Sequence, residues 1–353
     1  MKNFLPLLAL TCFAIAPLSA ARKPVAPAGA AYLGAIVIDA ENGQVIFEDN
    51  ADVVSPPASM AKLMTFAVLH DQLASGAIKL ESPVTVDAAD SKIGGTQVWL
   101  KEKEVFPVEE LIYAMMIQSA NDAAHALARS TAGSPEAFVQ LMNAKARALG
   151  MTHTTFRTPH GLPPSNRRKD EGDLTTPRDF ALLCQYLVRE TDVTKYTSIR
   201  TRPFGASRPT GAVTMNNHNH LLGHVAGLDG LKTGFTNGAG FCLSATVERN
   251  GRRLIVVAMG SSESKIRDIK VKELIERGFA ALPVRTTIKT AGAPAASTGA
   301  TAATHATPTP PATTDALPTV KTDKSAVAPA PVPSSTTAEP TVTFRVIPPH
   351  KIP

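Results

Sequence analysis

The sequence is poor in cysteine and in aromatic residues, and no apolar run in it is long enough to cross a membrane. Its three cysteines give neither a disulfide framework nor a metal-ligand motif. Cys12 lies in an N-terminal apolar run, and apolar residues flank Cys184 and Cys242, so we expect two buried free thiols rather than a disulfide. Aromatic residues make up 5% of the chain and the net charge of +6 is spread out, which indicates no nucleic-acid partner.

The N-terminal segment has the pattern of an export signal. Lys2 precedes an apolar run from Phe4 to Ile15, and small residues before Ala20 and Ala21 suit cleavage. The run is shorter than the roughly 20 residues that a transmembrane helix needs. We therefore expect residues 1–21 to be a signal peptide and the mature protein to be exported, soluble, and periplasmic or otherwise extracytoplasmic.

The composition changes near Leu282. Residues 284–353 are dominated by Pro, Ala, Thr and Ser, and they cannot bury enough apolar surface to offset the entropy lost on ordering. We expect a disordered tail. Its last apolar stretch, Phe344–Pro349, has too many prolines for an amphipathic membrane helix, so no stable membrane anchor is evident.

The segment 31–282 mixes strand and helix patterns and has the length of one large domain. Hairpins are predicted near both of its ends, and helical patterns fill the middle. Because both ends supply strands, we expect an α+β fold with one antiparallel sheet and helices on both faces. The predicted strands are Ala35–Asp39, Gln44–Glu48, Gly240–Glu248 and Arg253–Met259, and the predicted helices are Ser59–Leu73, Val108–Gln118, Asn121–Ser130, Glu136–Leu149, Thr176–Arg189 and Lys265–Ala281.

Ser59 and Lys62 form an S-x-x-K motif at the start of a predicted helix. Residues three apart share a helix face, so a lysine of lowered pKa can act as the base for the serine. The backbone N–H of Ser59, in the first turn, is free to donate to an oxyanion. The alternative is a helix-start serine beside a solvated lysine. We interpret the second S-x-x-K, Ser262 and Lys265, in this way because it lacks preceding prolines and an apolar helix.

Ser119-Ala120-Asn121 lies where a buried helix ends and the next begins. Leu111–Ile117 is apolar on nearly all sides, so polar residues directly after it must face a cavity or be hydrogen-bonded internally. A functional interpretation makes Ser119 a proton relay and lets Asn121 bond a substrate amide. The alternative is helix capping by Asn121 or Asp122.

Lys232-Thr233-Gly234 lies in a predicted strand. Glycine permits close approach of another backbone, and a peptide can pair with an open strand. Lys232 and Thr233 would hold the terminal carboxylate of such a peptide, and the N–H of Phe235 would be a second oxyanion donor. Lys232 would also lower the pKa of Lys62 if the motifs converge. The alternative is an exposed strand with a surface lysine.

The histidines offer a rival site. His218 and His220 alternate as ligands on a strand do, but no third ligand is evident, so we assign no metal. We interpret His160 as a loop residue that forms hydrogen bonds rather than as a base.

Taken together, these motifs resemble those of the serine-type D-alanyl-D-alanine carboxypeptidases, the low-molecular-mass penicillin-binding proteins. The resemblance covers about 31–282. It implies a fold of the β-lactamase/transpeptidase type, peptidoglycan stem peptides as substrates, β-lactams as inhibitors, and no metal or organic cofactor. The similar segments are Pro57–Thr65, Gly94–Leu100, Ser119–Ala123, Pro159–Leu162 and Gly230–Asn237.

The resemblance also implies roles for single residues. Ser59 would be the acylated nucleophile, Lys62 the general base, Ser119 the relay and Lys232 a substrate-binding residue. Arg267 stands where the family often has an arginine facing the substrate carboxylate. The implied reaction removes the terminal D-Ala from peptidoglycan pentapeptides through an acyl-enzyme.

Three other functions fit parts of the sequence. A D-alanyl-D-alanine endopeptidase, which cuts crosslinks, is the main alternative, because the tail replaces the second domain and membrane helix of many carboxypeptidases. A β-lactamase needs a deacylating base, and Gly161–Thr175 has no E-x-x-L-N pattern. A non-catalytic cell-wall-binding protein would not need every motif residue. Ala120, where the family usually has Gly, is a small departure.

Overall fold

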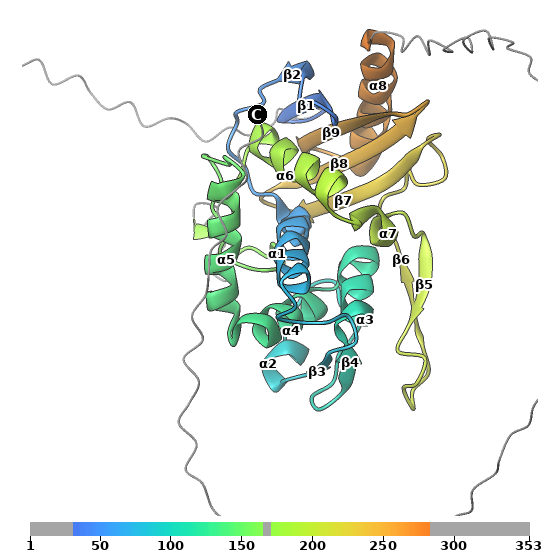
Figure 1. Cartoon of the computed structure of the whole chain (residues 1–353). Coiled ribbons are helices and arrows are strands. Elements are labelled where there is room, and N and C mark those ends of the chain that lie inside the picture. The colour runs from blue at the N-terminus through green and yellow to red at the C-terminus, as the bar shows by residue number, and fades with distance from the viewer. Residues whose placement is uncertain (1–30, 165–170, 283–353) are drawn as a thin grey trace, which may run out of the picture. The chain divides into compact units, whose positions relative to one another are not determined.

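The computed structural model describes residues 31–164 and 171–282 (Figure 1). In this part of the chain five strands form one antiparallel sheet in the order β2-β1-β9-β8-β7. Both ends of the domain supply strands to it, as the two hairpins predicted. The strands are β1 (Gly34–Asp39), β2 (Val45–Asp49), β7 (Leu228–Thr236), β8 (Gly240–Arg249) and β9 (Arg252–Ser261). The expected signal peptide and tail lie outside the described residues.

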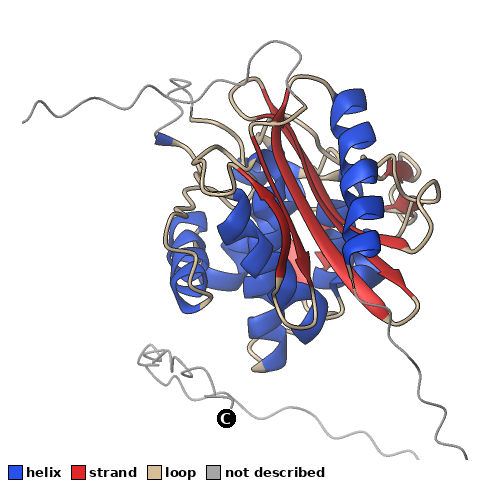
Figure 2. Ribbon diagram, turned by 90° about the horizontal axis from the view of Figure 1, so that it is seen from above, coloured by secondary structure: helices blue, strands red, loops and turns tan. Residues whose placement is uncertain are grey.

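Strand β1 is buried along its whole length and serves two separate cores. Ile36 and Ile38 join the larger core beneath most of the helices, whereas Ala35 and Val37 join the core beneath α8 (Ser264–Ala281). This division follows because successive side chains of a strand point to opposite faces. Figure 2 shows the strands between α8 and the other helices. The prediction of helices on both faces is confirmed.

The helices on the larger core lie close to the predicted segments. The chain begins α5 and α6 in the same way: Ser134 and Thr176 each accept a hydrogen bond from a backbone N–H of the first turn, and each is followed by proline. Both residue choices favour helix starts. The helices are α1 (Lys62–Ala74), α4 (Asn121–Ala132), α5 (Pro135–Ala148) and α6 (Pro177–Glu190).

The predicted helix 108–118 is present, but it changes character half-way. α3 (Val108–Tyr113) continues into a π-helical turn, Ala114–Gln118, which ends at Ser119 in the left-handed conformation with φ 65°. The turn is buried, as the apolar run predicted. A π-helical turn is a rare local widening that is often found at functional sites, so this irregularity marks the place where the second motif begins.

Several short elements carry no clear sequence signal and were not predicted. They include a hairpin of β5 and β6 that runs beside the helices in Figure 1. Cys184 and Cys242 are buried free thiols, as expected. Within the described ranges, none of the helices combines the length and the apolar character needed to cross a membrane. The short elements are α2 (Ala88–Ser91), α7 (Val193–Thr197), β3 (Pro83–Thr85), β4 (Val105–Pro107), β5 (Thr201–Phe204) and β6 (Val213–Asn216).

Candidate active site

Ser59 lies in a short 3-10 helix, Ala58–Ala61, directly before α1. The expected helix 59–73 therefore opens with a tighter turn, and Lys62 is the first residue of its α-helical part. Ser59 is partly exposed, whereas Lys62 is completely buried. The nucleophile candidate thus meets solvent while its neighbouring amine does not.

The amine of Lys62 is held by three oxygen atoms. Its Nζ lies 3.0 Å from Oγ of Ser59, 2.7 Å from Oδ1 of Asn121 and 2.7 Å from the carbonyl oxygen of His160. The last two oxygens only accept hydrogen bonds. A neutral amine therefore gives its two N–H bonds to Asn121 and His160 and directs its lone pair at the hydroxyl of Ser59. This arrangement allows the amine to act as a base toward the serine hydroxyl.

The surroundings of Lys62 favour its neutral form. Burial lowers the pKa of Lys62 well below its usual value, and the nearby charge of Lys232 lowers it further. Asp173 and Asp122 act in the opposite direction. Desolvation and a second cation are the two causes that make a lysine a base near neutral pH. The predicted influence of Lys232 on Lys62 is confirmed.

The second motif connects the amine to a neighbouring loop. Asn121 starts α4, donates from Nδ2 to the carbonyl of Gly94 at 2.8 Å, and donates its backbone N–H to Thr96 at 2.8 Å. Ser119 is buried, with 3% of its surface exposed. Asn121 is therefore bonded on both sides, so part of its role is to hold the amine and the loop together.

Asp122, the next residue, holds the other end of the same loop. Its buried carboxylate accepts hydrogen bonds from the backbone N–H groups of Val98 and Leu100. Between them stands Trp99, 59% exposed and with φ 53°. The loop is thus tied to the first turn of α4 at Asn121 and Asp122, which fixes its position beside Lys62.

The third motif lies on β7, at one end of the sheet order. A Cβ atom on Gly234 would lie 2.5 Å from the carbonyl oxygen of Pro57, so glycine is required where β7 passes the segment before Ser59. The expected close approach of another backbone to this glycine is present, and the approaching backbone belongs to the same chain. Lys232 is 3% exposed, and burial together with Arg267 lowers the pKa of Lys232 to about 7.

A comparison with known proteins shows which family has a similar sequence. Residues 21–263 match the model of a peptidase family described as D-alanyl-D-alanine carboxypeptidase. The chain belongs to this family. It is 32% identical over 245 residues to D-alanyl-D-alanine carboxypeptidase DacF of Bacillus subtilis, covering 69% of this chain and 61% of the relative. The chain therefore matches about three fifths of that relative's length.

Two further similarities bear on the site. The D-alanyl-D-alanine endopeptidase of Escherichia coli is 30% identical over 227 residues, which cover 64% of this chain and 70% of that protein. Penicillin-binding protein D2 of Listeria monocytogenes, solved with ampicillin bound, has a TM-score of 0.63 and 31% identity over 70% of this chain and 97% of its own. The β-lactamase/transpeptidase-type fold implied by the motifs agrees with this likeness.

The remaining predicted residues lie around the third motif. Thr233 is 7% exposed, and Phe235 is half exposed with its ring stacked on Phe241 at 4.2 Å. Arg267 is buried, and its guanidinium donates to Asp268 and to the carbonyl of Cys242. Arg267 also lowers the pKa of Lys232, so the two cations lie within electrostatic reach of each other.

Three groups at the site were not assigned roles from the sequence. The carbonyl of His160 accepts from Lys62, Asp173 lies close enough to raise the pKa of Lys62, and burial with Lys232 lowers the pKa of His218 to about 4. Pro159–Leu162 resembles a segment of the family, which was a signal for this turn but not for its carbonyl. A carbonyl has no residue-type signature, so its role was not visible in the sequence.

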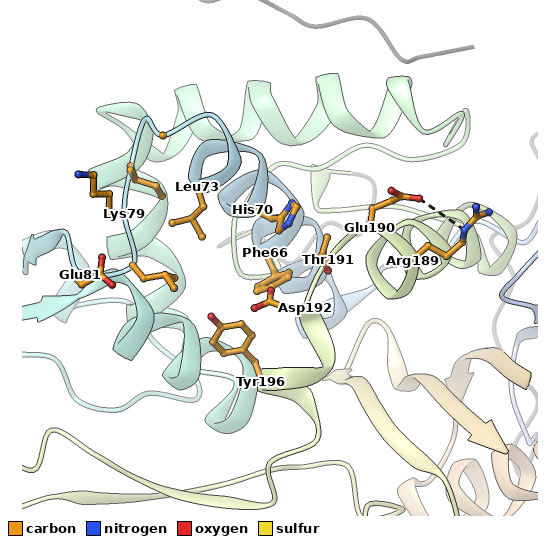
Figure 3. A pocket seen from close by; sticks show the side chains of 13 residues that line it. Phe66, His70, Leu73, Lys79, Glu81, Arg189, Glu190, Thr191, Asp192 and Tyr196 are labelled. Carbon is orange, nitrogen blue, oxygen red and sulfur yellow. Dashed lines mark ion pairs between the residues drawn. The ribbon is translucent and has the colours of Figure 1, made fainter. Parts of the chain in front are cut away.

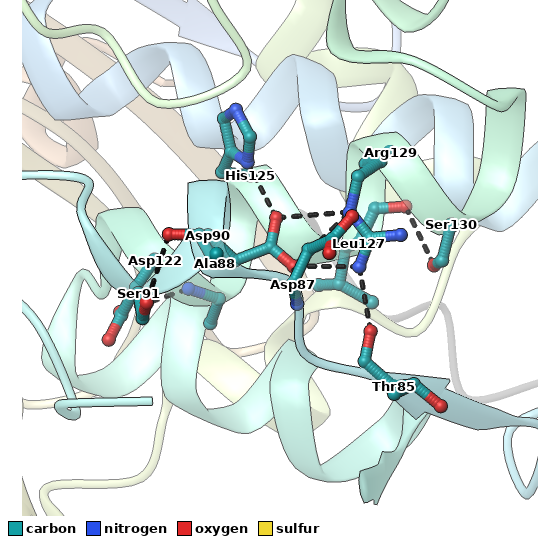
Figure 4. A network of polar contacts seen from close by, with 11 residues as sticks. Thr85, Asp87, Ala88, Asp90, Ser91, Asp122, His125, Leu127, Arg129 and Ser130 are labelled. Atoms are coloured by element: carbon teal, nitrogen blue, oxygen red, sulfur yellow. Dashed lines mark hydrogen bonds and ion pairs between the residues drawn. The ribbon is translucent and has the colours of Figure 1, made fainter. Parts of the chain in front are cut away.

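A buried acid, Asp90, connects α4 to the neighbouring short elements. Asp90 is fully buried, and its carboxylate accepts from Arg129 and contacts Nδ1 of His125 at 2.7 Å (Figure 4). Arg129 also reaches the carbonyl of Thr85 at 2.7 Å. These contacts tie α4 to α2 and β3. The helix that presents Asn121 is thereby anchored along its length.

The second S-x-x-K motif and a large cavity are separate from the site around Ser59 and Lys62. Ser262 and Lys265 are both exposed, in contrast to Lys62. A cavity of about 770 Å³ lies beside the second half of α1, where Phe66, His70 and other residues line it (Figure 3). His70 is three turns beyond Ser59, which is roughly 16 Å along a helix. Among the described residues no cluster of three metal-ligating side chains occurs.

Proposed function

We propose that this chain is a serine-type D-alanyl-D-alanine carboxypeptidase that removes the terminal D-Ala from peptidoglycan pentapeptides. One observation carries the proposal: the buried amine of Lys62 has two acceptor-only partners and Oγ of Ser59 as its third neighbour. Family membership supplies the substrate class. No metal or organic cofactor enters the proposed reaction.

In the proposed reaction Ser59 attacks the carbonyl between the two D-Ala residues while Lys62 takes its proton. The tetrahedral oxyanion is held by the backbone N–H groups of Ser59 and Phe235. Ser119 relays the proton from Lys62 to the leaving amine of the terminal D-Ala, which leaves Lys62 neutral again. Water then adds to the ester carbonyl of the acyl-enzyme, and Ser59 leaves with a proton, which restores the free enzyme.

The proposed substrate contacts come from three elements, β7, α8 and α4. Lys232 and Thr233 bind the terminal carboxylate, and Arg267 adds positive charge behind them. Asn121 bonds a substrate amide beside its contact with Lys62. Because β7 is the end strand of the sheet among the described residues, its outer edge can accept the peptide as an added strand.

We also propose that β-lactams acylate Ser59, by analogy with the ampicillin-bound relative. The β-lactam carbonyl takes the place of the peptide carbonyl, and the acyl-enzyme hydrolyses slowly. A non-catalytic role is not favoured, because the base and nucleophile candidates are in hydrogen-bond contact.

Export and domain limits follow from the sequence alone. We propose that residues 1–21 direct export, that 31–282 are the catalytic domain, and that 284–353 are a Pro/Ala/Thr-rich tail. The substrate class agrees with an extracytoplasmic location, since peptidoglycan stem peptides are processed outside the cytoplasmic membrane.

The test gives purified protein a muropeptide pentapeptide and a crosslinked dimer in parallel. Release of D-Ala from the pentapeptide, with covalent labelling by a fluorescent penicillin, is the expected result. Ser59→Ala abolishes both, whereas the control Ser262→Ala, at the exposed second S-x-x-K, leaves both unchanged. Cleavage of the dimer in preference to the pentapeptide would instead assign the endopeptidase activity of the Escherichia coli relative. If the protein showed no turnover and no labelling, the enzymatic proposal would be refuted.

A further inference from the structure

We infer that Asp173 is a positioning residue that fixes the carbonyl of His160 against the amine of Lys62. This inference rests on the proposed function, because it concerns the base of that reaction. Asp173 is a buried acid that belongs to none of the three motifs. Among the hydrogen bonds of the described residues, none joins Asp173 directly to Ser59 or Lys62.

The carboxylate of Asp173 accepts three hydrogen bonds from one short segment, residues 157 and 158. Oδ1 accepts the backbone N–H groups of Arg157 at 2.5 Å and Thr158 at 2.9 Å, and Oδ2 accepts the hydroxyl of Thr158 at 2.9 Å. Asp173 is 3% exposed. Hydrogen bonds to a buried carboxylate are stronger than neutral ones, and leaving such a group unpaired is costly. The position of residues 157 and 158 is therefore strongly determined.

This segment in turn positions the carbonyl that faces Lys62. The hydroxyl oxygen of Thr158 accepts the N–H of Gly161 at 2.8 Å, which closes a turn around residues 159 and 160. The carbonyl of Pro159 accepts the hydroxyl of Thr65 at 2.6 Å, and that of His160 accepts Nζ of Lys62 at 2.7 Å. Both bonds go to α1. Asp173 thus reaches Lys62 through three hydrogen bonds in series: its own bond to Thr158, the bond between Thr158 and Gly161, and the bond between His160 and Lys62.

The turn is also pressed against the nucleophile segment. Gly161 has φ 84°, and a Cβ atom there would overlap the carbonyl oxygen of Ala58. A shift of the turn would therefore change the contact with Ala58 and the hydrogen bond to Lys62 at the same time. Small displacements of catalytic groups cost rate steeply, because the reacting atoms must meet in a near-attack arrangement.

The charge of Asp173 matters in addition to its bonds. Burial raises the pKa of Asp173 to about 6, against the influence of its hydrogen bonds and of Lys62. The other charged or titratable groups that act on Lys62 are Lys232 from β7 and Asp122 from α4, and His160 on the turn is held neutral with a pKa of about 3. Protonation of Asp173 near pH 6 would weaken the grip on Thr158.

A different role for Asp173 is a base that activates water on the acyl-enzyme. Asp173 lines a cavity of about 260 Å³ with Pro56, Gly161 and Asn237, among others. Its three hydrogen bonds, however, engage Oδ1 twice and Oδ2 once, so a water-activating role would have to use the one remaining acceptor site of Oδ2. We favour the positioning role, and the two roles differ in which step they slow.

The test compares two variants with a matched control. Asp173→Asn keeps the side-chain shape but removes the charge, and Thr158→Val removes the hydroxyl that joins Asp173 to Gly161. The control is Asp179→Asn: Asp179 is equally buried and accepts the N–H of His153 at 2.7 Å and the hydroxyl of Thr154 at 2.8 Å, away from Lys62. Thermal melting selects conditions in which all three variants are folded.

The readout is acylation by a fluorescent penicillin, resolved into a dissociation constant and a first-order acylation rate. Asp173→Asn and Thr158→Val are expected to lower the acylation rate about 10- to 100-fold with the dissociation constant unchanged. Asp179→Asn leaves both unchanged. The wild-type rate falls as pH decreases through about 6, and Asp173→Asn loses that inflection while Thr158→Val keeps it.

Three outcomes would overturn the inference. They are an Asp173→Asn acylation rate equal to that of Asp179→Asn, a change in the dissociation constant alone, or slowing of deacylation alone, which would indicate the water-activating role. Failure of the proposed function is recognised separately, since wild-type protein would then be neither labelled nor active on pentapeptide.

Discussion

The amine of Lys62 and the side-chain carbonyl of Asn121 lie 2.7 Å apart, although 59 residues separate them in the chain. This contact joins the first motif to the second. It also gives Asn121 a task that precedes any contact with substrate, because the bond orients the base. Asn121 in turn is held by Gly94 and Thr96, so the base is fixed by a chain of bonds rather than by one neighbour.

Replacing Asn121 by Ala should slow acylation of Ser59 by about 100-fold, the order of loss for one preorganised hydrogen bond at an active site. The variant leaves one N–H of the Lys62 amine without its partner, so the lone pair is no longer directed at the serine. Stopped-flow labelling with a fluorescent penicillin measures the rate. Gln185→Ala is the control, because the side-chain amide of Gln185 also donates to a backbone carbonyl, that of Ala40, which directly follows β1. Equal rates in the two variants would contradict the assigned role.

Gly161→Ala should abolish acylation, whereas Gly76→Ala should not. Both glycines have a positive φ, 84° and 75°, so both variants carry the same kind of backbone strain, about 1 kcal/mol. Only at Gly161 does the added methyl group meet another segment, the carbonyl of Ala58 next to Ser59; at Gly76 nothing lies within 4 Å. Labelling and thermal melting are measured on both. An active Gly161→Ala would show that the turn does not constrain the nucleophile.

The pH dependence of kcat/KM should show an alkaline limb near pH 7. This parameter reports the free enzyme, in which the pKa of Lys232 is about 7. Lys232 is protonated below that pH and binds the substrate carboxylate; above it the charge is lost and binding weakens. Lys232→Arg keeps the charge at all these pH values, so its limb should move out of the range pH 7–9. An unchanged limb in this variant would assign it to another group.

Buried Lys232 should also make the protein more stable as pH rises from 7 to 9. The pKa of Lys232 is about 7 in the folded protein, against 10.5 for an ordinary lysine, so the unfolded chain holds an extra proton across this range. The free energy of unfolding then increases by about 1.4 kcal/mol per pH unit from this group, and this gain is lost as pH falls to 7. Urea unfolding of wild type and Lys232→Met measures it. Parallel pH profiles for the two proteins would refute the assignment.

Much of the fold was predictable because it is encoded by local pattern. The hairpin at Arg249 and Gly251 follows from turn chemistry, and the amphipathic helices follow from apolar spacing. The π-helical turn at Ala114–Gln118 was not predictable, since its apolar sequence suits an ordinary helix equally well. The β5–β6 hairpin was missed because each of its strands has only four residues and Pro203 interrupts β5.

At the site, the sequence by itself determined which chemical groups are available and that Ser59 and Lys62 share one face. It also indicated that the residues after Ile117 must be satisfied inside the protein. Only the tertiary structure decided the state of those groups. The lowered pKa of Lys62 depends on burial by distant segments and on Lys232, and its amine is held in place by the backbone carbonyl of His160, which Asp173 positions. Residue types and spacing record neighbours along the chain, whereas desolvation and charge act through space, and so the reactivity of Ser59 is a property of the folded molecule.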